Sequence, residues 1–193
     1  TVFNLLSGID RPDAGEVRFE GRRIDRLPAN RVSALGIGRT FQSVRVFGDM
    51  TVRENLRVAD LNGGQRGKPG AVARIADALA FVDMSAHAEA TAGLLSYGQR
   101  KLVELAMVLV QAPKLILLDE PVAGVNPVLV NKIGGILGRL AERGQALLVV
   151  EHNIPFITRL CQRIIVMANG GILTEGSADE VRKDARVLEA FLG

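Results

Sequence analysis

The sequence has few of the residues that build disulfide frameworks, metal clusters and aromatic surfaces. Its 193 residues include one cysteine, two histidines, one tyrosine and no tryptophan. A single cysteine excludes a disulfide framework and a zinc site made of several thiolates. Two histidines leave little for an imidazole-based metal centre. Chemistry that needs clusters of thiols or imidazoles is therefore not expected.

A strong charge of one sign and a long apolar run are also lacking. The net charge is +3 and the basic residues are scattered, which is too mild to indicate nucleic-acid binding. The longest mostly apolar stretch, 102–118, contains Glu104, Gln111, Pro113 and Lys114, so it does not match a membrane-spanning helix. No signal-peptide pattern opens the chain. Because 48% of the residues are hydrophobic, we expect a water-soluble, cytoplasmic domain with a real core.

Short apolar runs without alternation predict buried strands in the second half. They cover 115–118, 146–150 and 164–168, and helical patterns lie between them. Such an order is typical of a mostly parallel sheet that is covered on both faces. Asn169-Gly170-Gly171 predicts a hairpin turn into a strand over 172–175, which places an antiparallel pair at one edge.

The first half predicts shorter elements and a helical insert. Thr51-Val52-Arg53-Glu54 has the pattern of a capping box that opens a helix, and we expect a helical subdomain over about 51–112. The remaining expectations are a helix over 2–8, a strand over 16–20 that pairs with 24–27 across a turn at 21–23, a helix over 28–35, a strand over 37–41, a loop over 61–70 and a helix over 71–82.

Charged residues follow two of the predicted strands. The first strand delivers Asp119 and Glu120, and the second delivers Glu151 and His152. Ligands bind beyond the carboxyl ends of parallel strands. Magnesium prefers carboxylate and water oxygens, and a neighbouring carboxylate can orient and deprotonate a water molecule. The alternative is that Asp119 and Glu120 merely end a strand and cap a turn.

A second motif, Leu95-Ser96-Tyr97-Gly98-Gln99, lies at the start of a predicted helix. Ser96 caps an N-terminus whose unpaired N–H groups suit a phosphate, and Gly98 lets a ligand approach the backbone. A plain helix cap is the alternative. Gln42 and His152, each placed after a strand, are weak signals alone, because such residues are more often polar surface or structural groups.

The order of these motifs along one chain is far more specific than any one of them. It resembles the nucleotide-binding domain of the ATP-binding-cassette (ABC) family over essentially the whole chain. The resemblance implies a P-loop NTPase-like α/β fold with a mostly parallel sheet, antiparallel edge strands and a helical insert, forming one domain over 1–193. In it, Gln42 is the Q-loop glutamine, 95–99 the signature, Asp119 and Glu120 the Walker-B pair, 122–126 the D-loop and His152 the switch histidine.

The resemblance is to the ATP-binding subunits of branched-chain amino-acid importers in particular. It is carried by the segments 39–47, 97–99, 120–127, 151–153 and 184–193. It implies an ATPase that energises import of branched-chain or related amino acids from the inner face of the cell membrane. The implied partners are a second ATP-binding subunit, identical or not, transmembrane permease subunits and, indirectly, a periplasmic or extracellular substrate-binding protein.

The resemblance also implies a role for each site residue, with ATP and Mg²⁺ as cofactors. Catalysis falls to Glu120, His152 and Gln42, and the magnesium ligands are Asp119 and Gln42. The residues implied in nucleotide binding are Thr1, Ser96, Gly98, Gln99 and Asn126. Asn126 stands where the D-loop usually has aspartate, which is a departure from the family pattern.

One motif of the family is missing from these residues. No G-x-x-x-x-G-K-[ST] phosphate loop is present, and Thr1 to Leu5 look like the helix that follows that loop. We therefore expect an N-terminally truncated domain, and we expect the 193 residues alone to be inactive. The alternatives are a truncated, catalytically inactive nucleotide-binding fragment and an ABC ATPase that does not serve transport.

Overall fold

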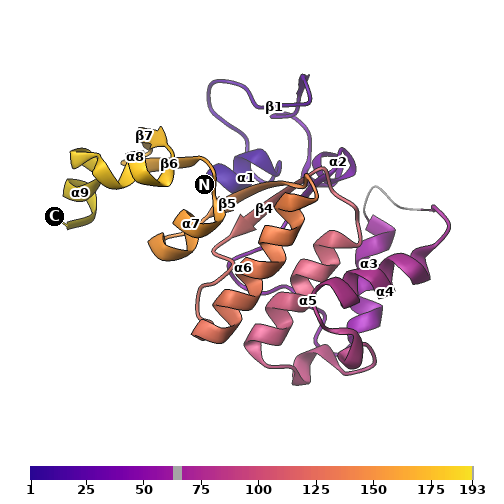
Figure 1. Cartoon of the computed structure of the whole chain (residues 1–193). Coiled ribbons are helices and arrows are strands. Elements are labelled where there is room, and N and C mark those ends of the chain that lie inside the picture. Colours follow the sequence, from indigo (N-terminus) through magenta and orange to yellow (C-terminus); the bar gives the residue numbers. More distant parts are fainter. Residues whose placement is uncertain (63–66, 193) are drawn as a thin grey trace. The chain divides into compact units, whose positions relative to one another are not determined.

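Three parallel strands form the central sheet of residues 1–150, in the order β3, β4, β5 (Figure 1). The computed structural model describes residues 1–62 and 67–192. The strands are β3 (Ile37–Arg39), β4 (Leu115–Asp119) and β5 (Ala146–Val150). Arg39 pairs with Leu117, and Asp119 pairs with Val150. The register therefore brings the carboxyl ends of all three strands to one edge.

The strands differ in burial, and only part of the expectation is met. The middle residues of β4 are fully buried, as its apolar run predicts. Residues of β5 instead alternate between exposed and half-buried, so the expectation of burial on both faces was wrong for this strand. The exposed residues Ala146, Leu148 and Val150 alternate along the strand, so they share one face of β5, and this face is not covered by the described residues.

Two short helices pack near β3 and β4. The helix α1 (Val2–Leu6) ends before Gly8, whose φ of +70° suits glycine at a helix stop. The helix α2 (Ala29–Ala34) leads into β3. The buried cluster that joins these elements consists of Phe3, Ile24, Val32, Ile37 and Leu117. A helix at 2–8 and another at 28–35 were predicted, and both are present.

The predicted hairpin near residue 20 is present with a shifted turn. The strands are β1 (Arg18–Phe19) and β2 (Arg22–Arg23), which are antiparallel. Glu20 and Gly21 form the turn, with φ of +49° and +76°. The expectation that 21–23 turns and 24–27 pairs back was wrong, because a two-residue turn with positive φ lets the chain reverse earlier. Ile24 alone of that segment extends the hairpin, because its backbone N–H donates to the carbonyl of Val17 over 2.8 Å, and its side chain is buried in the core.

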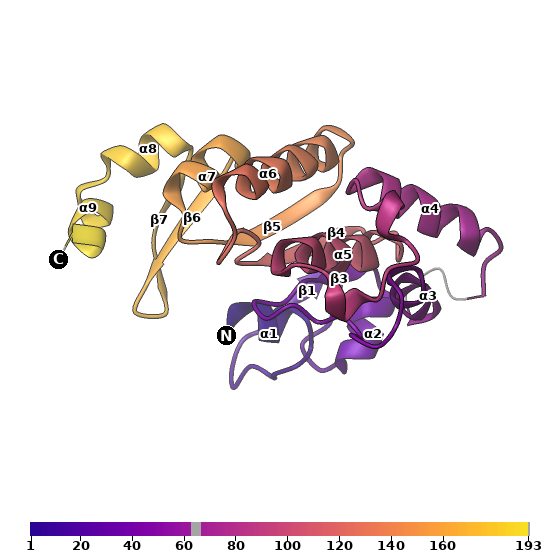
Figure 2. The same ribbon diagram turned by 90° about the horizontal axis from the view of Figure 1, so that it is seen from below.

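A group of helices follows β3 (Figure 2). The Thr51–Glu54 capping box is present, since each residue's backbone N–H donates to the other's side chain. The first helix starts at residue 52 and continues into the predicted loop, of which 63–66 lie outside the described residues. The three α-helices of this group, α3, α4 and α5, contact one another. The elements of this group are α3 (Val52–Asn62), α4 (Ala71–Phe81), η1 (Ser85–His87), η2 (Ala92–Leu94) and α5 (Tyr97–Leu109).

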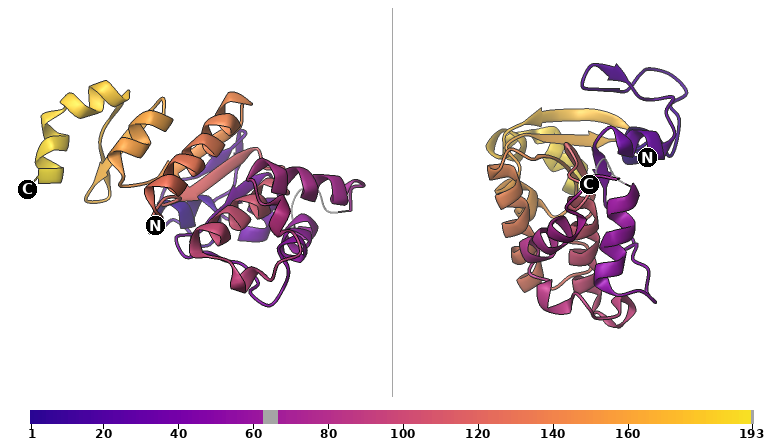
Figure 3. Two further views of the ribbon diagram at one scale, coloured as in Figure 1. Left: turned by 60° about the horizontal axis from the view of Figure 1, so that its bottom comes forward. Right: turned by 90° about the vertical axis from the view of Figure 1, so that its right-hand side faces the viewer.

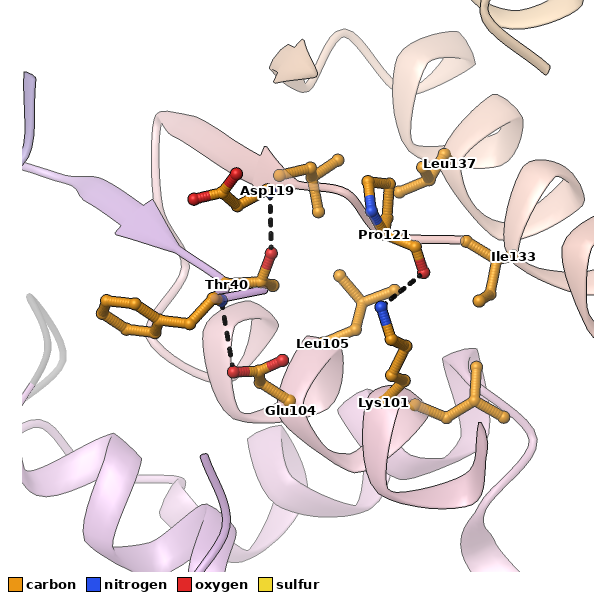
Figure 4. Close-up of a pocket in the computed structure, with 11 residues that line it drawn as sticks. Thr40, Lys101, Glu104, Leu105, Asp119, Pro121, Ile133 and Leu137 are labelled. Carbon is orange, nitrogen blue, oxygen red and sulfur yellow. Dashed lines mark hydrogen bonds between the residues drawn. The ribbon is translucent and has the colours of Figure 1, made fainter. Parts of the chain in front are cut away.

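The longest described helix, α6 (Pro127–Glu142), lies between β4 and β5 in the chain. Asn126 caps it, with proline at its first position. Its residues Ile133 and Leu137 line a small cavity together with Leu118 of β4 (Figure 4). Helix α6 therefore borders the same cavity as the carboxyl end of β4.

A second unit begins at Glu151. Its two strands form the antiparallel ribbon in Figure 3, with Asn169 and Gly170 in the predicted turn. A capping box between Ser177 and Glu180 opens the helix that follows, as predicted. No helix of the described residues is long and apolar enough to cross a membrane. The elements are α7 (Ile154–Leu160), β6 (Ile164–Ala168), β7 (Gly171–Gly176), α8 (Ala178–Lys183) and α9 (Ala185–Leu192).

Candidate functional site

The chain turns sharply where β4 ends. Glu120 has a φ of +46°, in the left-handed region that side chains other than glycine and asparagine rarely adopt. Its backbone N–H donates to the carbonyl of Val150 over 2.9 Å, so the strand pairing holds this conformation. Backbone strain of this kind is concentrated at functional sites, where the surrounding structure imposes it.

Gln42 and Glu120 meet at this edge of the sheet. Gln42 follows β3 by three residues, and its Nε2 donates to Oε2 of Glu120 over 3.0 Å. The two residues are 78 positions apart in the sequence. The parallel register of β3 and β4 therefore brings together two of the residues predicted for catalysis.

Asp119 is held by an arginine that the sequence analysis missed. Nη2 of Arg39 donates to Oδ2 of Asp119 over 3.0 Å, and Nη1 donates to Oδ1 of Asn4 on α1 and to Oγ of Ser7 at its C-cap, each over 2.8 Å. The Arg39 side chain is only 10% exposed. The backbone N–H of Asp119 donates to Oγ1 of Thr40 over 3.3 Å. Arg39 thus ties α1 to the predicted magnesium ligand.

The motif at 95–99 builds a complete capping box. Oγ of Ser96 accepts from the backbone N–H of Gln99 over 3.3 Å, and Oε1 of Gln99 accepts from the N–H of Ser96 over 2.9 Å. Nε2 of Gln99 also lies 3.0 Å from Nε2 of His87, a residue to which the sequence analysis gave no role. The Tyr97 hydroxyl reaches the carbonyl of Gln42 over 3.5 Å.

Packing gives a second explanation for a glycine at position 98, beside the ligand approach that was inferred from the sequence. A Cβ at this position would come within 2.1 Å of Cδ2 of Leu129 on α6. The space beside the Gly98 backbone is therefore filled by a protein side chain. Asn126 caps that same helix, because its Oδ1 accepts from the N–H of Leu129 over 2.9 Å.

Thr1 and His152 are the remaining predicted site residues. Thr1 precedes α1, and its carbonyl accepts from the N–H of Asn4 over 2.9 Å. His152 belongs to the second unit, where its backbone N–H donates to Oε2 of Glu151 over 2.9 Å. The roles of both in nucleotide chemistry stay predictions.

Two further ionisable residues near this edge were not singled out from the sequence. Lys101 and Glu104 on α5 are both buried, with 7% and 6% of their surface exposed. Burial raises the pKa of Glu104 against the opposing effect of hydrogen bonds from the backbone of Arg45 and Phe41. A signal was available in the sequence, because both residues interrupt the apolar positions Leu102 and Leu105 of a helix.

The oxygen donors at the edge suit a hard cation. Asp119 and Glu120 are adjacent carboxylates at the end of one strand, and magnesium is usually held by one or two carboxylates together with waters and phosphate oxygens. Asp119 already binds the Arg39 guanidinium, which shows that its carboxylate is placed to receive positive charge.

Comparison with known proteins agrees with this fold. A family model described as "ABC transporter" matches residues 1–123. Two solved ATP-binding cassettes of ABC transporters, one in its ADP conformation and one nucleotide-free, superpose with a TM-score of 0.88 each, at 32% and 31% identity. Each match covers the whole chain and 82% of the solved one. The class is therefore that of ATP-binding cassettes with an α/β fold.

The chain belongs to the ABC transporter family of ATP-binding proteins. Among similar curated proteins, the high-affinity branched-chain amino acid transport ATP-binding protein BraF of Pseudomonas aeruginosa is 33% identical over the whole chain, which covers 82% of its length. The probable branched-chain amino acid transport ATP-binding protein LivG of Archaeoglobus fulgidus is 35% identical, and the chain covers 79% of it.

Proposed function

We propose that this chain is the ATP-hydrolysing subunit of a transporter that imports branched-chain or related amino acids. The observation that carries the hydrolytic part is the Gln42–Glu120 hydrogen bond of 3.0 Å beside Asp119, at the carboxyl edge of the sheet. The amino-acid class is supported by the names of relatives that are about one third identical over the whole chain.

Glu120 is the general base in this proposal. Its carboxylate accepts a hydrogen bond from Gln42, and in the same position it would orient a water molecule for attack on the terminal phosphate and accept its proton. Gln42 senses the state of the nucleotide and relays it toward the permease. His152 contacts the terminal phosphate.

Asp119 is the residue that would hold magnesium, with Gln42 as a second ligand. When bound with ATP, magnesium neutralises charge on the phosphates during phosphoryl transfer. The chain's own contribution is to hold the Asp119 carboxylate in place, through Arg39 and through the bond from its backbone N–H to Thr40. Asp119→Ala is expected to weaken magnesium-dependent ATP binding, measured by titration calorimetry with and without Mg²⁺. Equal affinity in the variant and the wild type contradicts this role.

The remaining predicted residues contact nucleotide in an assembly of two subunits. Thr1 lies near the phosphates of its own chain, whereas Ser96, Gly98, Gln99 and Asn126 serve the nucleotide held by the partner subunit. We propose that 51–112 forms a helical subdomain that carries the signature and faces the permease. The assembly works at the cytoplasmic face of the membrane, with the substrate-binding protein acting on the other side.

The substrate is tested by uptake. In cells that lack the gene, uptake of labelled leucine, isoleucine or valine is expected to fall and to recover with the wild-type gene, but not with Glu120→Gln. Normal leucine, isoleucine and valine uptake without the gene contradicts the substrate class.

The 193 residues alone, without a phosphate-loop motif, are expected to hydrolyse almost no ATP. Turnover equal to that of the same residues preceded by a phosphate-loop segment contradicts that expectation.

A further inference from the structure

Helix α5 carries two buried ionisable side chains whose partners lie in different segments. Lys101 and Glu104 are three positions apart, so they lie on neighbouring parts of one helix face. Both line the small cavity, about 20 Å³, shown in Figure 4. Burying ionised groups costs folding free energy that an apolar residue would not cost, so a positional role is a reason for their presence.

Glu104 holds the segment that presents Gln42. Its Oε1 accepts from the backbone N–H of Phe41 over 3.3 Å and from that of Arg45 over 3.2 Å. These two amides flank Gln42, one immediately before it and one three residues after it. A single carboxylate oxygen therefore fastens the chain on both sides of Gln42 to α5.

Lys101 holds the backbone of Glu120, the hydrogen-bond partner of Gln42. Its Nζ donates to the carbonyl of Glu120 over 2.9 Å and lies 3.4 Å from the carbonyl of Pro121. Glu120 is the residue with the left-handed backbone, and its N–H donates to the carbonyl of Val150. Lys101 thus supports the strained peptide that places the Glu120 carboxylate.

Helix α5 contacts both partners of the Gln42–Glu120 hydrogen bond. Helix α5 reaches Gln42 through Glu104 and Glu120 through Lys101, and the Gln42 and Glu120 side chains meet over 3.0 Å. We propose that Lys101 and Glu104 are positioning residues that set the Gln42–Glu120 geometry from the helix that begins at Ser96. This inference rests on the proposed function, since it assigns a purpose to that pair.

Two variants and their conservative counterparts test it in a protein that consists of these residues preceded by a phosphate-loop segment. Lys101→Met and Glu104→Leu are expected to lower kcat for ATP by about ten- to a hundredfold, with little change in ATP affinity, because misplacing reacting groups by about 1 Å costs that much. Lys101→Arg and Glu104→Gln keep a donor and an acceptor and are expected to recover most of the rate. Val103→Ala is the control, since Val103 is buried on the same helix and does not line the cavity.

A second readout does not depend on turnover. In Glu104→Leu, the backbone amides of Phe41 and Arg45 are expected to exchange with solvent at least about tenfold faster, because they lose their acceptor. Unchanged exchange, failure of the conservative variants to recover the rate, or an equal loss in Val103→Ala overturns the positioning role. Loss of hydrolysis in Glu120→Gln with normal kcat in Lys101→Met and Glu104→Leu overturns only this inference. Hydrolysis retained in Glu120→Gln overturns the proposed function.

Discussion

At the residue scale, the site depends on a buried arginine that joins two parts of the first unit. Arg39 donates to Asn4 on α1, to Ser7 at the C-cap of α1 and to the carboxylate of Asp119 at the end of β4. Its guanidinium also lies 4.8 Å from the ring centre of Phe41, within range of a cation–π contact. One side chain therefore holds a helix and a predicted metal ligand in a fixed relation.

Replacing this arginine should cost stability. Arg39→Met is expected to lower the free energy of unfolding by about 2 kcal/mol, because the charged Asp119 and the neutral Asn4 and Ser7 all lose their donor at a largely buried site. Urea denaturation measures this. Arg18→Met is the control, because Arg18 pairs with Glu16 at the surface with 56% of its side chain exposed. Surface pairs contribute about 0–1 kcal/mol, so equal losses in the two variants would contradict the account.

Glu104 makes the free energy of unfolding depend on pH, and the direction of this dependence follows from the shift of its pKa. Burial raises the pKa above the ordinary 4.5, so the folded protein holds this proton more tightly than the unfolded chain. The resulting stability is present below pH 4.5 and is lost as the pH rises through the folded pKa. Relative to Glu104→Gln, the wild type should lose unfolding free energy as the pH rises from 4.5 through the raised pKa of the folded state. A constant or growing advantage of the wild type contradicts this.

At the element scale, α5 and α6 meet at a glycine. Because a Cβ on Gly98 would lie 2.1 Å from Leu129, Gly98→Ala is expected to lower the free energy of unfolding by about 1–3 kcal/mol through overpacking. Leu129→Ala in the same chain should relieve that clash. Gly135→Ala on α6 meets nothing within 4 Å and should instead stabilise by about 0.5–1 kcal/mol. If Gly98→Ala stabilises like Gly135→Ala, ligand approach is the better reason for the glycine.

The cap of α6 tests the departure from the usual D-loop residue. Asn126→Asp keeps an oxygen acceptor for the N–H of Leu129, so stability should stay within about 0.5 kcal/mol. Asn126→Ala removes the acceptor and should cost about 1 kcal/mol. Thermal unfolding of the two variants beside the wild type measures the difference, and equal melting temperatures for all three would show that the cap contributes nothing.

Local patterns in the sequence predicted most elements, and the misses have local causes. Neighbouring residues determine the capping boxes at Ser96 and Ser177 and the Asn169-Gly170 turn, so the sequence alone predicts these features. The early turn at Glu20 was missed because a glutamate at positive φ is uncommon. The exposure of one face of β5 depends on whether other segments cover it, which no local pattern encodes.

At the scale of the whole molecule, the site joins segments that are far apart in the chain. Gln42 and Glu120 were predicted separately, and the parallel register brings them into contact across 78 positions. Arg39, Lys101 and Glu104 were missed because their importance lies in partners on other segments, which a sequence pattern does not name. The resemblance to a family gave the expected roles of Gln42 and Glu120, whereas the residues that hold them in place became visible only in the structure.

The decisive experiment is single-turnover ATP hydrolysis by Glu120→Gln in the protein that consists of these residues preceded by a phosphate-loop segment. The account predicts that ATP still binds and that the rate of cleavage falls by about a hundredfold or more, because the group that accepts the proton is gone. Glu151→Gln, which changes the acidic residue after β5, serves as the comparison and should retain far more of the rate. Cleavage by Glu120→Gln at the wild-type rate would contradict the account.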